Sequence, residues 1–372
     1  MKYYIIAGEA SGDLHASNLM AEIKKKDRRA EFRGFGGDLM QKQGMSLVKH
    51  YRTMAYMGFV EVAVNLRKVL DNIKLCKNDI MEWQPDALIL VDYPGFNLRI
   101  AKFAHEKGFK VFYYISPQVW AWKRRRVSKI KASVDKMLVI LPFEEEFYRN
   151  YGVDVAYVGN PLLDEMQKFG TPNRSMFLRR NNLGEKREII ALLPGSRPQE
   201  IKRTLGTMLK VAPQFPQYQF VVAGVSSVDI SLYKRIIGNA DVFLVENQTY
   251  ELLQNASAAL VTSGTATLET ALFSVPEVVC YKATGFSYRI AKKLIKVKFI
   301  CLVNLIMDRE VVKELIQGEM TPDNIAAELN LLLHDAKRQQ RLLEDYDELR
   351  DVLGNAGASE RAAEVICDAM KT

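Results

Sequence analysis

Glycine, carboxylate and hydroxyl residues cluster at four places that follow apolar runs, and the first of these is residues 8–13 (Gly-Glu-Ala-Ser-Gly-Asp). A helical pattern follows at Leu14–Lys25, in which His15 lies near the start. Glycines at such a place let the backbone approach an anion or a sugar at a helix N-terminus. The alternative is a tight turn capped by Ser11 or Asp13, with His15 as a structural hydrogen-bonding residue.

The second cluster begins at Asp92, directly after the apolar run Ala87–Val91. Residues 93–97 (Tyr-Pro-Gly-Phe-Asn) then force the chain to turn. A carboxylate at the carboxyl end of a parallel strand faces the ligand crevice of an open α/β sheet, where it can take a proton from a substrate hydroxyl. A helix-capping aspartate is the alternative.

The other two clusters lie in the second half of the chain. Residues 192–197 (Leu-Leu-Pro-Gly-Ser-Arg) end a strand-like run and Glu200 follows as a helix begins. A glycine, a hydroxyl and an arginine there suit a diphosphate, although a capped turn with a surface arginine has the same pattern. Residues 262–269 (Thr-Ser-Gly-Thr-Ala-Thr-Leu-Glu) offer backbone N–H groups for phosphate oxygens and Glu269 for ribose. Two such turns predict a nucleotide-binding domain.

A basic segment follows two tryptophans in the first half. Residues 119–122 are Val-Trp-Ala-Trp, and six of the nine residues from Lys123 to Lys131 are basic. Aromatic residues beside a basic cluster suit anionic lipid headgroups, and nucleic acid could use the same groups. A solvated helix face above packed tryptophans is the alternative. The amphipathic stretch Phe59–Trp83 is a second candidate, although most such helices face their own core.

The elements that position these clusters alternate between short apolar runs and helical patterns, which indicates an α/β protein with parallel sheets covered on both faces. The breaker-rich stretch Gln167–Lys186 predicts a boundary between two α/β halves. From Ala336 onward we expect two closing helices, separated at residues 354–357 (Gly-Asn-Ala-Gly). The predicted strands are 3–7, 87–91, 111–115, 136–141, 188–193, 219–223, 242–245, 258–262 and 277–281.

Composition excludes several classes of protein. The chain has 372 residues, 48% of them hydrophobic and 26% charged, so disordered and collagen-like proteins are excluded. Its net charge of +8 favours an anionic partner without choosing one. Scattered cysteines argue against disulfides and zinc ribbons and fit a reducing compartment, so we expect a cytosolic chain. No run is long enough to cross a bilayer, so membrane contact would be peripheral. The four cysteines are Cys76, Cys280, Cys301 and Cys367.

Other chemistries lack their motifs. No Asp-x-Asp pair of the metal-binding kind follows a strand-like run, and the four histidines, at positions 15, 50, 105 and 334, form no metal-ligand pattern. We therefore expect no metal and no cofactor. Arginine and helix dipoles would then stabilise the negative charge of the phosphates. Neither a dinucleotide glycine triplet, a phosphate loop with its lysine, nor a Gly-x-Ser-x-Gly elbow is present, which argues against hydride transfer, ATP hydrolysis and acyl transfer.

Taken together, these segments resemble the lipid A disaccharide synthase family of glycosyltransferases over nearly the whole chain. Ala16 and Asn160 depart from residues frequent in the family, and the second departure puts a catalytic side chain at that position in doubt. The matching segments are residues 7–15, 34–37 (Gly-Phe-Gly-Gly), 57–62 (Met-Gly-Phe-Val-Glu-Val), 92–97, 114–122 (Tyr-Ile-Ser-Pro-Gln-Val-Trp-Ala-Trp), 141–144 (Leu-Pro-Phe-Glu), 193–197 and 263–269.

The resemblance implies two Rossmann-like, doubly wound domains of the GT-B type facing a central cleft. It places an acceptor-binding, membrane-facing domain at 1–170, a UDP-sugar donor domain at 186–340, and helices at 341–372 that cross back to the first domain. It implies an inverting transfer from UDP-2,3-diacylglucosamine to 2,3-diacylglucosamine 1-phosphate, giving a β-1,6-linked disaccharide and UDP. The expected location is the inner face of the inner membrane of a Gram-negative bacterium, with no nucleic acid partner; the family also suggests a homodimer.

The resemblance also implies roles for individual residues. Asp92 would be the general base on the acceptor 6-hydroxyl, with Glu9 and His15 lining the same cleft. The segment 302–305 (Leu-Val-Asn-Leu) and the residues after it resemble the family's late donor-site region. The expected donor residues are Gly195, Ser196, Arg197, Gly264, Thr265, Ala266, Thr267, Glu269, Asn304 and Gln317. The expected acceptor and membrane residues are Gly8, Ser11, Gly12, Asn97, Gln118, Trp120, Trp122, Arg124, Arg125 and Arg126.

Two rival interpretations remain. A UDP-sugar transferase or epimerase of the same fold that acts on a soluble sugar would share the nucleotide half. It would not require acylated substrates for activity, whereas a lipid A disaccharide synthase would. A non-enzymatic protein that binds anionic membrane or RNA is supported by charge alone. It would leave Asp92 and the two phosphate-binding turns without a role.

Overall fold

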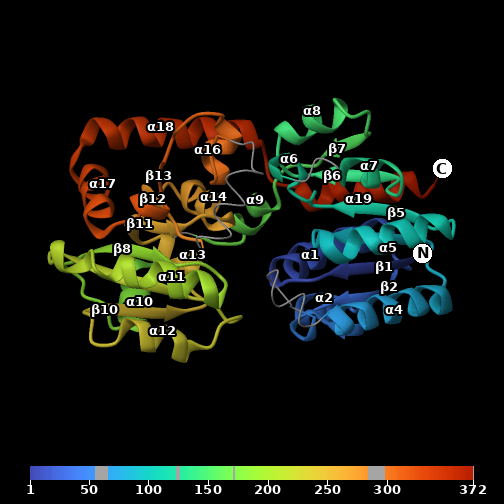
Figure 1. The fold of residues 1–372 in the computed structure, drawn as a ribbon, viewed down its shortest axis with the longest axis horizontal. Helices are drawn as coiled ribbons and strands as arrows, with labels where there is room; N and C mark the ends of the chain where they lie inside the picture. The colour runs from blue at the N-terminus through green and yellow to red at the C-terminus, as the bar shows by residue number, and fades with distance from the viewer. Residues whose placement is uncertain (55–65, 123–125, 171, 284–297, 372) are drawn as a thin grey trace. The chain divides into compact units, whose positions relative to one another are not determined.

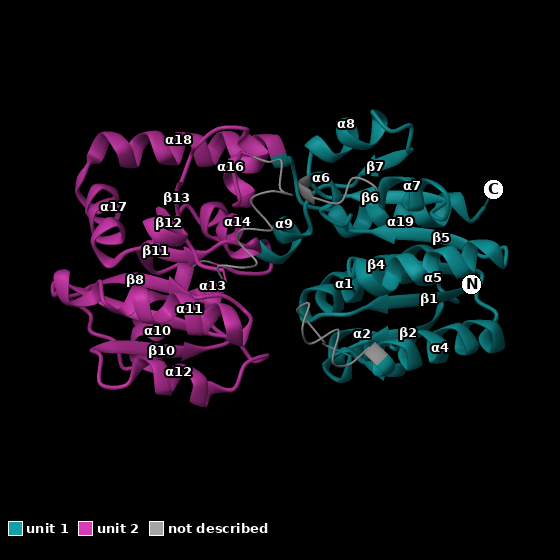
Figure 2. Ribbon diagram, viewed as in Figure 1, with its two compact units in different colours: residues 1–166, 353–372 teal, residues 167–352 magenta. Residues whose placement is uncertain are grey.

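The computed structural model describes residues 1–54, 66–122, 126–170, 172–283 and 298–371, with helices and strands throughout (Figure 1). The chain divides into two compact units (Figure 2). Unit 1 contains residues 1–166 and 353–372, and unit 2 contains residues 167–352. Unit 1 is therefore discontinuous in sequence.

Unit 1 is built on a seven-stranded sheet in which every pairing is parallel. The strand order is β3-β2-β1-β4-β5-β6-β7, so β1 and β4 are central neighbours. The strands are β1 (Lys2–Ala7), β2 (Glu31–Gly36), β3 (Ser46–His50), β4 (Ala87–Val91), β5 (Lys110–Tyr114), β6 (Lys136–Val139) and β7 (Val155–Tyr157).

Alternation along the strands divides the core of unit 1 into two layers. Tyr4 and Ile6 belong to one buried cluster, while Tyr3, Ile5 and Ala7 belong to another. Successive side chains of a strand point to opposite faces, so both faces of the sheet are covered. Helices α4, α5, α7 and α8 contribute to the first cluster, and α1, α2 and α19 contribute to the second.

Short turns and helices connect the strands of unit 1. The predicted helix Phe59–Trp83 is present as α4 from Leu66 onward, and residues 59–65 lie outside the described residues. The helices are α1 (Ala10–Lys26), α2 (Asp38–Lys42), η1 (Tyr51–Thr53), α4 (Leu66–Trp83), α5 (Pro94–Glu106), α6 (Val119–Trp122), α7 (Arg126–Lys131), α8 (Phe143–Arg149), α9 (Pro161–Met166) and α19 (Ala358–Ala369).

Unit 2 repeats this plan with a six-stranded parallel sheet of order β10-β9-β8-β11-β12-β13. Its strands are β8 (Glu188–Leu193), β9 (Tyr218–Gly224), β10 (Val242–Glu246), β11 (Ala256–Thr262), β12 (Glu277–Tyr281) and β13 (Lys313–Ile316). Its helices are α10 (Arg174–Arg180), α11 (Pro198–Leu209), η2 (Ala212–Gln214), α12 (Ile230–Ile237), α13 (Thr249–Leu253), α14 (Thr265–Leu272), α16 (Leu302–Met307), η3 (Gln317–Glu319), α17 (Pro322–His334) and α18 (Ala336–Leu353).

The closing helices belong to different units. α18 packs on unit 2, where the Tyr346 hydroxyl donates to the carbonyl of Val275 at 3.3 Å. α19 packs against α1 in unit 1. The Asp164 carboxylate, within α9, accepts hydrogen bonds from the backbone N–H groups of residues 357, 358 and 359 and so caps α19.

The predicted strands and the two closing helices are confirmed, since each predicted run overlaps a strand and the helices separate at residues 354–357. Four further strands, β2, β3, β7 and β13, are not among the predicted runs. Within the described ranges, no helix combines the length and the apolar character needed to span a membrane.

Candidate active site

Asp92 lies at the carboxyl end of the central strand β4, in a strained backbone conformation. Asp92 and the next residue, Tyr93, have φ angles of 43° and 48°, in the left-handed region that non-glycine residues rarely occupy. Pro94 then begins α5. The Asp92 N–H donates to the carbonyl of Tyr114 on β5 at 3.1 Å. The turn therefore places Asp92 at the carboxyl edge of the sheet. Its backbone strain must be offset by other contacts.

Two side chains hold this turn through hydrogen bonds to its backbone. The Tyr113 hydroxyl donates to the Asp92 carbonyl at 2.5 Å, and the Asn97 amide donates to the same oxygen at 2.7 Å. Asn97 also donates to the carbonyl of Val91 at 3.2 Å and is fully buried. Its amide therefore shapes the Asp92 turn, and a contact of Asn97 with an acceptor stays a prediction.

The 8–13 segment lies beside this turn, because β1 and β4 are paired with Ala7 opposite Val91. A Cβ atom on Gly8 would lie 2.4 Å from the ring of Tyr93, so only glycine fits there. Glu9 is the half-buried N-cap residue of α1, and His15 is buried one turn further on. Of the predicted acceptor residues here, Ser11 is exposed and Gly12 is buried.

Asp13 does not cap its own helix. Its carboxylate accepts from the N–H groups of Gly37, Leu39 and Met40 at 2.8–3.1 Å, which caps α2 instead. The expectation that Ser11 or Asp13 caps α1 is therefore wrong, because the N-cap residue is Glu9 and no side-chain hydrogen bond from it caps the helix. The signal missed was the glycine pair at 36–37, which starts α2 after β2.

The predicted membrane residues divide into buried, exposed and undescribed ones. Trp120 is only 6% exposed, and its indole N–H donates to the Glu144 carboxylate at 3.2 Å. The indole therefore packs inside unit 1, which corrects its prediction as a membrane-contacting side chain. Gln118 is exposed, and Arg126 is half-buried, where burial lowers the pKa of its guanidinium. Arg124, Arg125 and the Trp122 side chain lie outside the described residues.

In unit 2, the turn after β8 is built around Glu200. Gly195 has a φ of 110°, and a Cβ atom there would lie 2.7 Å from Glu200 Oε2. Glu200 accepts from the Ser196 N–H at 3.3 Å and pairs with the Arg197 guanidinium at 3.4 Å. Ser196 and Arg197 are exposed at the start of α11. This turn presents a cation and a helix N-terminus together, as a diphosphate requires.

The second predicted phosphate turn begins α14, whose N-cap residue is Gly264. Gly264 and Thr265 are exposed and Ala266 is half-buried, so their backbone is accessible. Thr267 is fully buried, with its hydroxyl donating to the Gly264 carbonyl at 2.9 Å. The Thr267 side chain therefore closes the helix turn and does not face a ligand. Glu269 accepts from the Tyr250 hydroxyl at 3.0 Å, while burial raises the pKa of its carboxyl.

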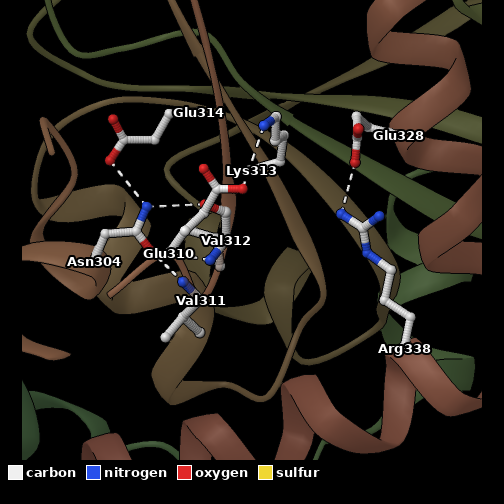
Figure 3. A network of polar contacts seen from close by, with 8 residues as sticks. All are labelled: Asn304, Glu310, Val311, Val312, Lys313, Glu314, Glu328 and Arg338. Atoms are coloured by element: carbon white, nitrogen blue, oxygen red, sulfur yellow. Dashed lines mark hydrogen bonds and ion pairs between the residues drawn. The ribbon is translucent and has the colours of Figure 1, made fainter. Parts of the chain in front are cut away.

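The two secondary donor candidates are engaged inside unit 2. Asn304 is fully buried, and its amide group bonds the backbone of Val311 and Val312 and the Glu314 carboxylate at 2.8–3.0 Å (Figure 3). In the orientation that satisfies both of its polar atoms, the Gln317 amide pairs with the backbone N–H and carbonyl of Ala283. Both amides therefore position backbone here, and a direct contact of either with UDP stays a prediction.

Chain comparisons agree with the resemblance noted from the sequence. Residues 3–367 match the model of the family described as lipid-A-disaccharide synthetase. The chain belongs to this family. The lipid-A-disaccharide synthase of Syntrophus aciditrophicus is 44% identical over 366 residues, which cover 96% of this chain and 95% of the relative. Membership in the lipid-A-disaccharide synthetase family makes the chain a glycosyltransferase of lipid A biosynthesis.

Solved structures identify the fold as GT-B. A UDP-GlcNAc 2-epimerase from Neisseria meningitidis, bound to UDP-GlcNAc, superposes with a TM-score of 0.70 at 13% identity. The superposition covers 99% of this chain and 100% of the epimerase chain. The glycotransferase of kitacinnamycin superposes with a TM-score of 0.64 at 14% identity, with 99% of each chain covered. At these identities the likeness concerns the fold alone. Among the described residues, no three His, Cys, Asp or Glu side chains form a group that could hold a metal ion.

Proposed function

We propose that the chain transfers 2,3-diacylglucosamine from UDP to the 6-hydroxyl of 2,3-diacylglucosamine 1-phosphate. The products are a β-1,6-linked tetraacyl disaccharide 1-phosphate and UDP. Family membership supports the overall reaction. The observation that carries the residue-level proposal is the Asp92 turn, because strained backbone held by buried polar contacts is characteristic of functional sites.

Asp92 acts as the general base in this proposal. Its carboxylate removes the proton of the acceptor 6-hydroxyl as the oxygen attacks the anomeric carbon. The bond from that carbon to the UDP oxygen breaks, and attack from the face opposite UDP inverts the anomeric carbon from α to β. Glu9 and His15 line the same acceptor site, as their places on the neighbouring segment allow.

Unit 2 holds the donor. The Arg197 guanidinium and the N–H groups at the start of α11 and α14 bind the diphosphate and stabilise UDP as it leaves. Glu269 binds the ribose hydroxyls, with Tyr250 orienting its carboxylate. UDP binding is supported by fold neighbours, since one of the superposed structures carries UDP-GlcNAc.

Both substrates carry two acyl chains, so the proposed site of action is the inner leaflet of the inner membrane. The net charge of +8 supports attraction to anionic lipid. A homodimer is part of the same proposal and rests on the family alone.

The test is a mixed-micelle assay with UDP-2,3-diacylglucosamine and 2,3-diacylglucosamine 1-phosphate, which follows UDP and disaccharide in the presence of EDTA. Disaccharide formed with chelator supports both the reaction and its independence of a metal. If the acylated pair gives no product while an unacylated UDP-sugar releases UDP, the soluble-sugar alternative replaces this proposal. That alternative is favoured only by the fold neighbours that are UDP-GlcNAc 2-epimerases.

A further inference from the structure

A buried carboxyl group lies next to the loop that follows β5. Glu144, in the first turn of α8, is only 1% exposed. One of its oxygens accepts from the backbone N–H groups of Ile140 and Leu141, at 3.3 and 3.1 Å, where the chain leaves β6. The other accepts from the Trp120 indole at 3.2 Å. A single carboxylate thus joins the end of β6 to α6.

Buried polar side chains lie between this carboxylate and the Asp92 turn. The Ser116 hydroxyl interacts with Glu144 and forms a hydrogen bond of 2.7 Å with the Tyr148 hydroxyl. Tyr148 and Tyr113 belong to the same buried cluster, and the Tyr113 hydroxyl donates to the Asp92 carbonyl. These side chains come from β5, its following loop and α8, and all of them are buried.

The loop between these contacts is itself constrained. Ile115, the residue after β5, has a φ of 65°, a strained conformation for a β-branched side chain. Trp120 packs edge-on against Phe143, with ring centroids 5.0 Å apart. Gln118 is the exposed residue between these anchors. The loop is therefore held at Ser116 and at Trp120, and both anchors depend on Glu144.

We propose that Glu144 is a positioning residue for acceptor binding. Its carboxylate fixes the position of the loop 116–120 relative to the Asp92 turn. The inference rests on the proposed function, because it assigns the acceptor to this edge of the sheet. Glu144 itself touches no substrate. Its loss moves Gln118 and Asp92 relative to each other, and small displacements of such groups cost much in binding and rate.

The charge state of Glu144 gives the inference a distinct signature. Burial raises the pKa of the Glu144 carboxyl to about 7, against the opposing effect of its hydrogen bonds. The titratable groups that face it are Tyr148 on its own helix and Tyr157 on β7, and burial raises the pKa of both above the ordinary tyrosine value, so both stay neutral near pH 7. Arg361 of α19 acts on Tyr157. Protonation turns one of its oxygens into a donor that faces N–H groups, so it weakens the contacts through which Glu144 holds the loop.

The experiment compares Glu144→Gln with Glu146→Gln, a matched control at an exposed position of the same helix. We expect Glu144→Gln to raise the KM for the acceptor about tenfold and to leave the KM for the UDP-sugar unchanged. In wild type and Glu146→Gln, the acceptor KM falls as pH rises through about 7; in Glu144→Gln it does not. Equal acceptor KM values in the two variants, or equal rises for donor and acceptor, would overturn the inference.

A spectroscopic measurement separates this inference from the proposed reaction. The Trp120 indole N–H resonance of the ¹⁵N-tryptophan-labelled protein, assigned with Trp120→Phe, should shift near pH 7 in wild type and not in Glu144→Gln. A wild-type resonance that does not titrate overturns the inference, whatever the activity. If Glu144→Gln does not fold, Trp120→Phe replaces it as the test variant. This substitution removes the indole N–H donor and keeps an aromatic ring at the position. Trp120→Phe then raises the acceptor KM if the inference holds, and a folded variant with unchanged KM overturns it.

Discussion

At the scale of single residues, the Asp92 turn shows what the sequence can and cannot reveal. A carboxylate after an apolar run, followed by proline and glycine, correctly predicts a side chain at the carboxyl end of a strand. The left-handed conformation of Asp92 and Tyr93 is not readable from the sequence, because Tyr113 and Asn97 impose it through hydrogen bonds.

The Asp92 assignment has a direct test. Asp92→Asn keeps the size of the side chain and removes its basicity, so we expect turnover to fall by about 10²- to 10⁴-fold while UDP binding is retained. The measurement is kcat in the micelle assay. Asp86→Asn is the control, because Asp86 lies at the other end of the same strand and accepts from the Lys2 N–H. Full activity in Asp92→Asn would remove the general-base assignment.

Glu277 could not be singled out from the sequence, because it belongs to none of the predicted motifs. Its carboxyl is 1% exposed and has no hydrogen-bond partner in the described structure, and burial raises its pKa well above the ordinary value. A raised folded-state pKa adds stability at low pH, which is lost as pH rises from the unfolded value near 4.5 through the folded value.

We therefore expect Glu277→Gln to unfold at a temperature that changes less with pH than that of wild type. Its stability relative to wild type should increase as pH rises. Thermal melts from pH 5 to pH 9 measure this, with Glu185→Gln at an exposed position as the control. Parallel curves for wild type and Glu277→Gln would contradict the expected proton uptake.

At the scale of elements, prediction worked best for the interior of the sheets. Runs such as Ala87–Val91 are continuously apolar because both faces of a parallel sheet are buried. The unpredicted strands β3, β7 and β13 are edge strands of three to five residues that are mostly half-buried, so their apolar signal is weak. β2 is internal, but Arg33 interrupts it to pair with Asp79 on α4.

The site was less predictable because its contacts are distant in sequence. The sequence does not reveal what Asn304 and Gln317 contact, since their partners lie in the backbone of other segments. Glu200 carried a readable signal. A glutamate in the first turn of a helix commonly reaches back to the N-terminal backbone, and here it organises the Gly195 turn.

Gly195→Ala tests that turn. The added Cβ meets Glu200 and the φ of 110° is unfavourable for alanine, a strain of about 1–3 kcal/mol. We expect UDP affinity to fall about tenfold in calorimetric titrations. Gly206→Ala is the control, because its Cβ meets nothing within 4 Å inside the same α11, where alanine should stabilise the helix by up to about 1 kcal/mol. Unchanged affinity in Gly195→Ala argues against this turn as the diphosphate site.

Asp164→Ala tests how α19 is attached. Three N–H groups lose their acceptor, and loss of an N-cap costs about 0.5–2 kcal/mol. We expect faster amide hydrogen exchange along α19. Asp368→Ala, at an exposed position on the same helix, should leave that exchange nearly unchanged. Equal exchange in both variants would show that apolar packing on α1 suffices.

At the scale of the whole molecule, the charge of +8 should appear as salt-dependent attraction to anionic surfaces. Lys129→Gln with Lys131→Gln removes two exposed charges of the basic segment. Each is expected to be worth about 1 kcal/mol, so binding to phosphatidylglycerol vesicles should weaken about 30-fold in sedimentation assays. Lys107→Gln with Lys110→Gln, near the amino end of β5, is the control. If both pairs behave alike, the segment is an ordinary solvated face.

The discontinuity of unit 1 has a consequence for the order of synthesis. Ala362, Ala363 and Ile366 of α19 share a core layer with Leu19 and Ile23 of α1. A ribosome that has finished β7 has made the whole sheet of unit 1, yet all of unit 2 must be translated before α19 arrives. During that interval the nascent chain exposes an apolar surface on α1, at which chaperones and proteases can act.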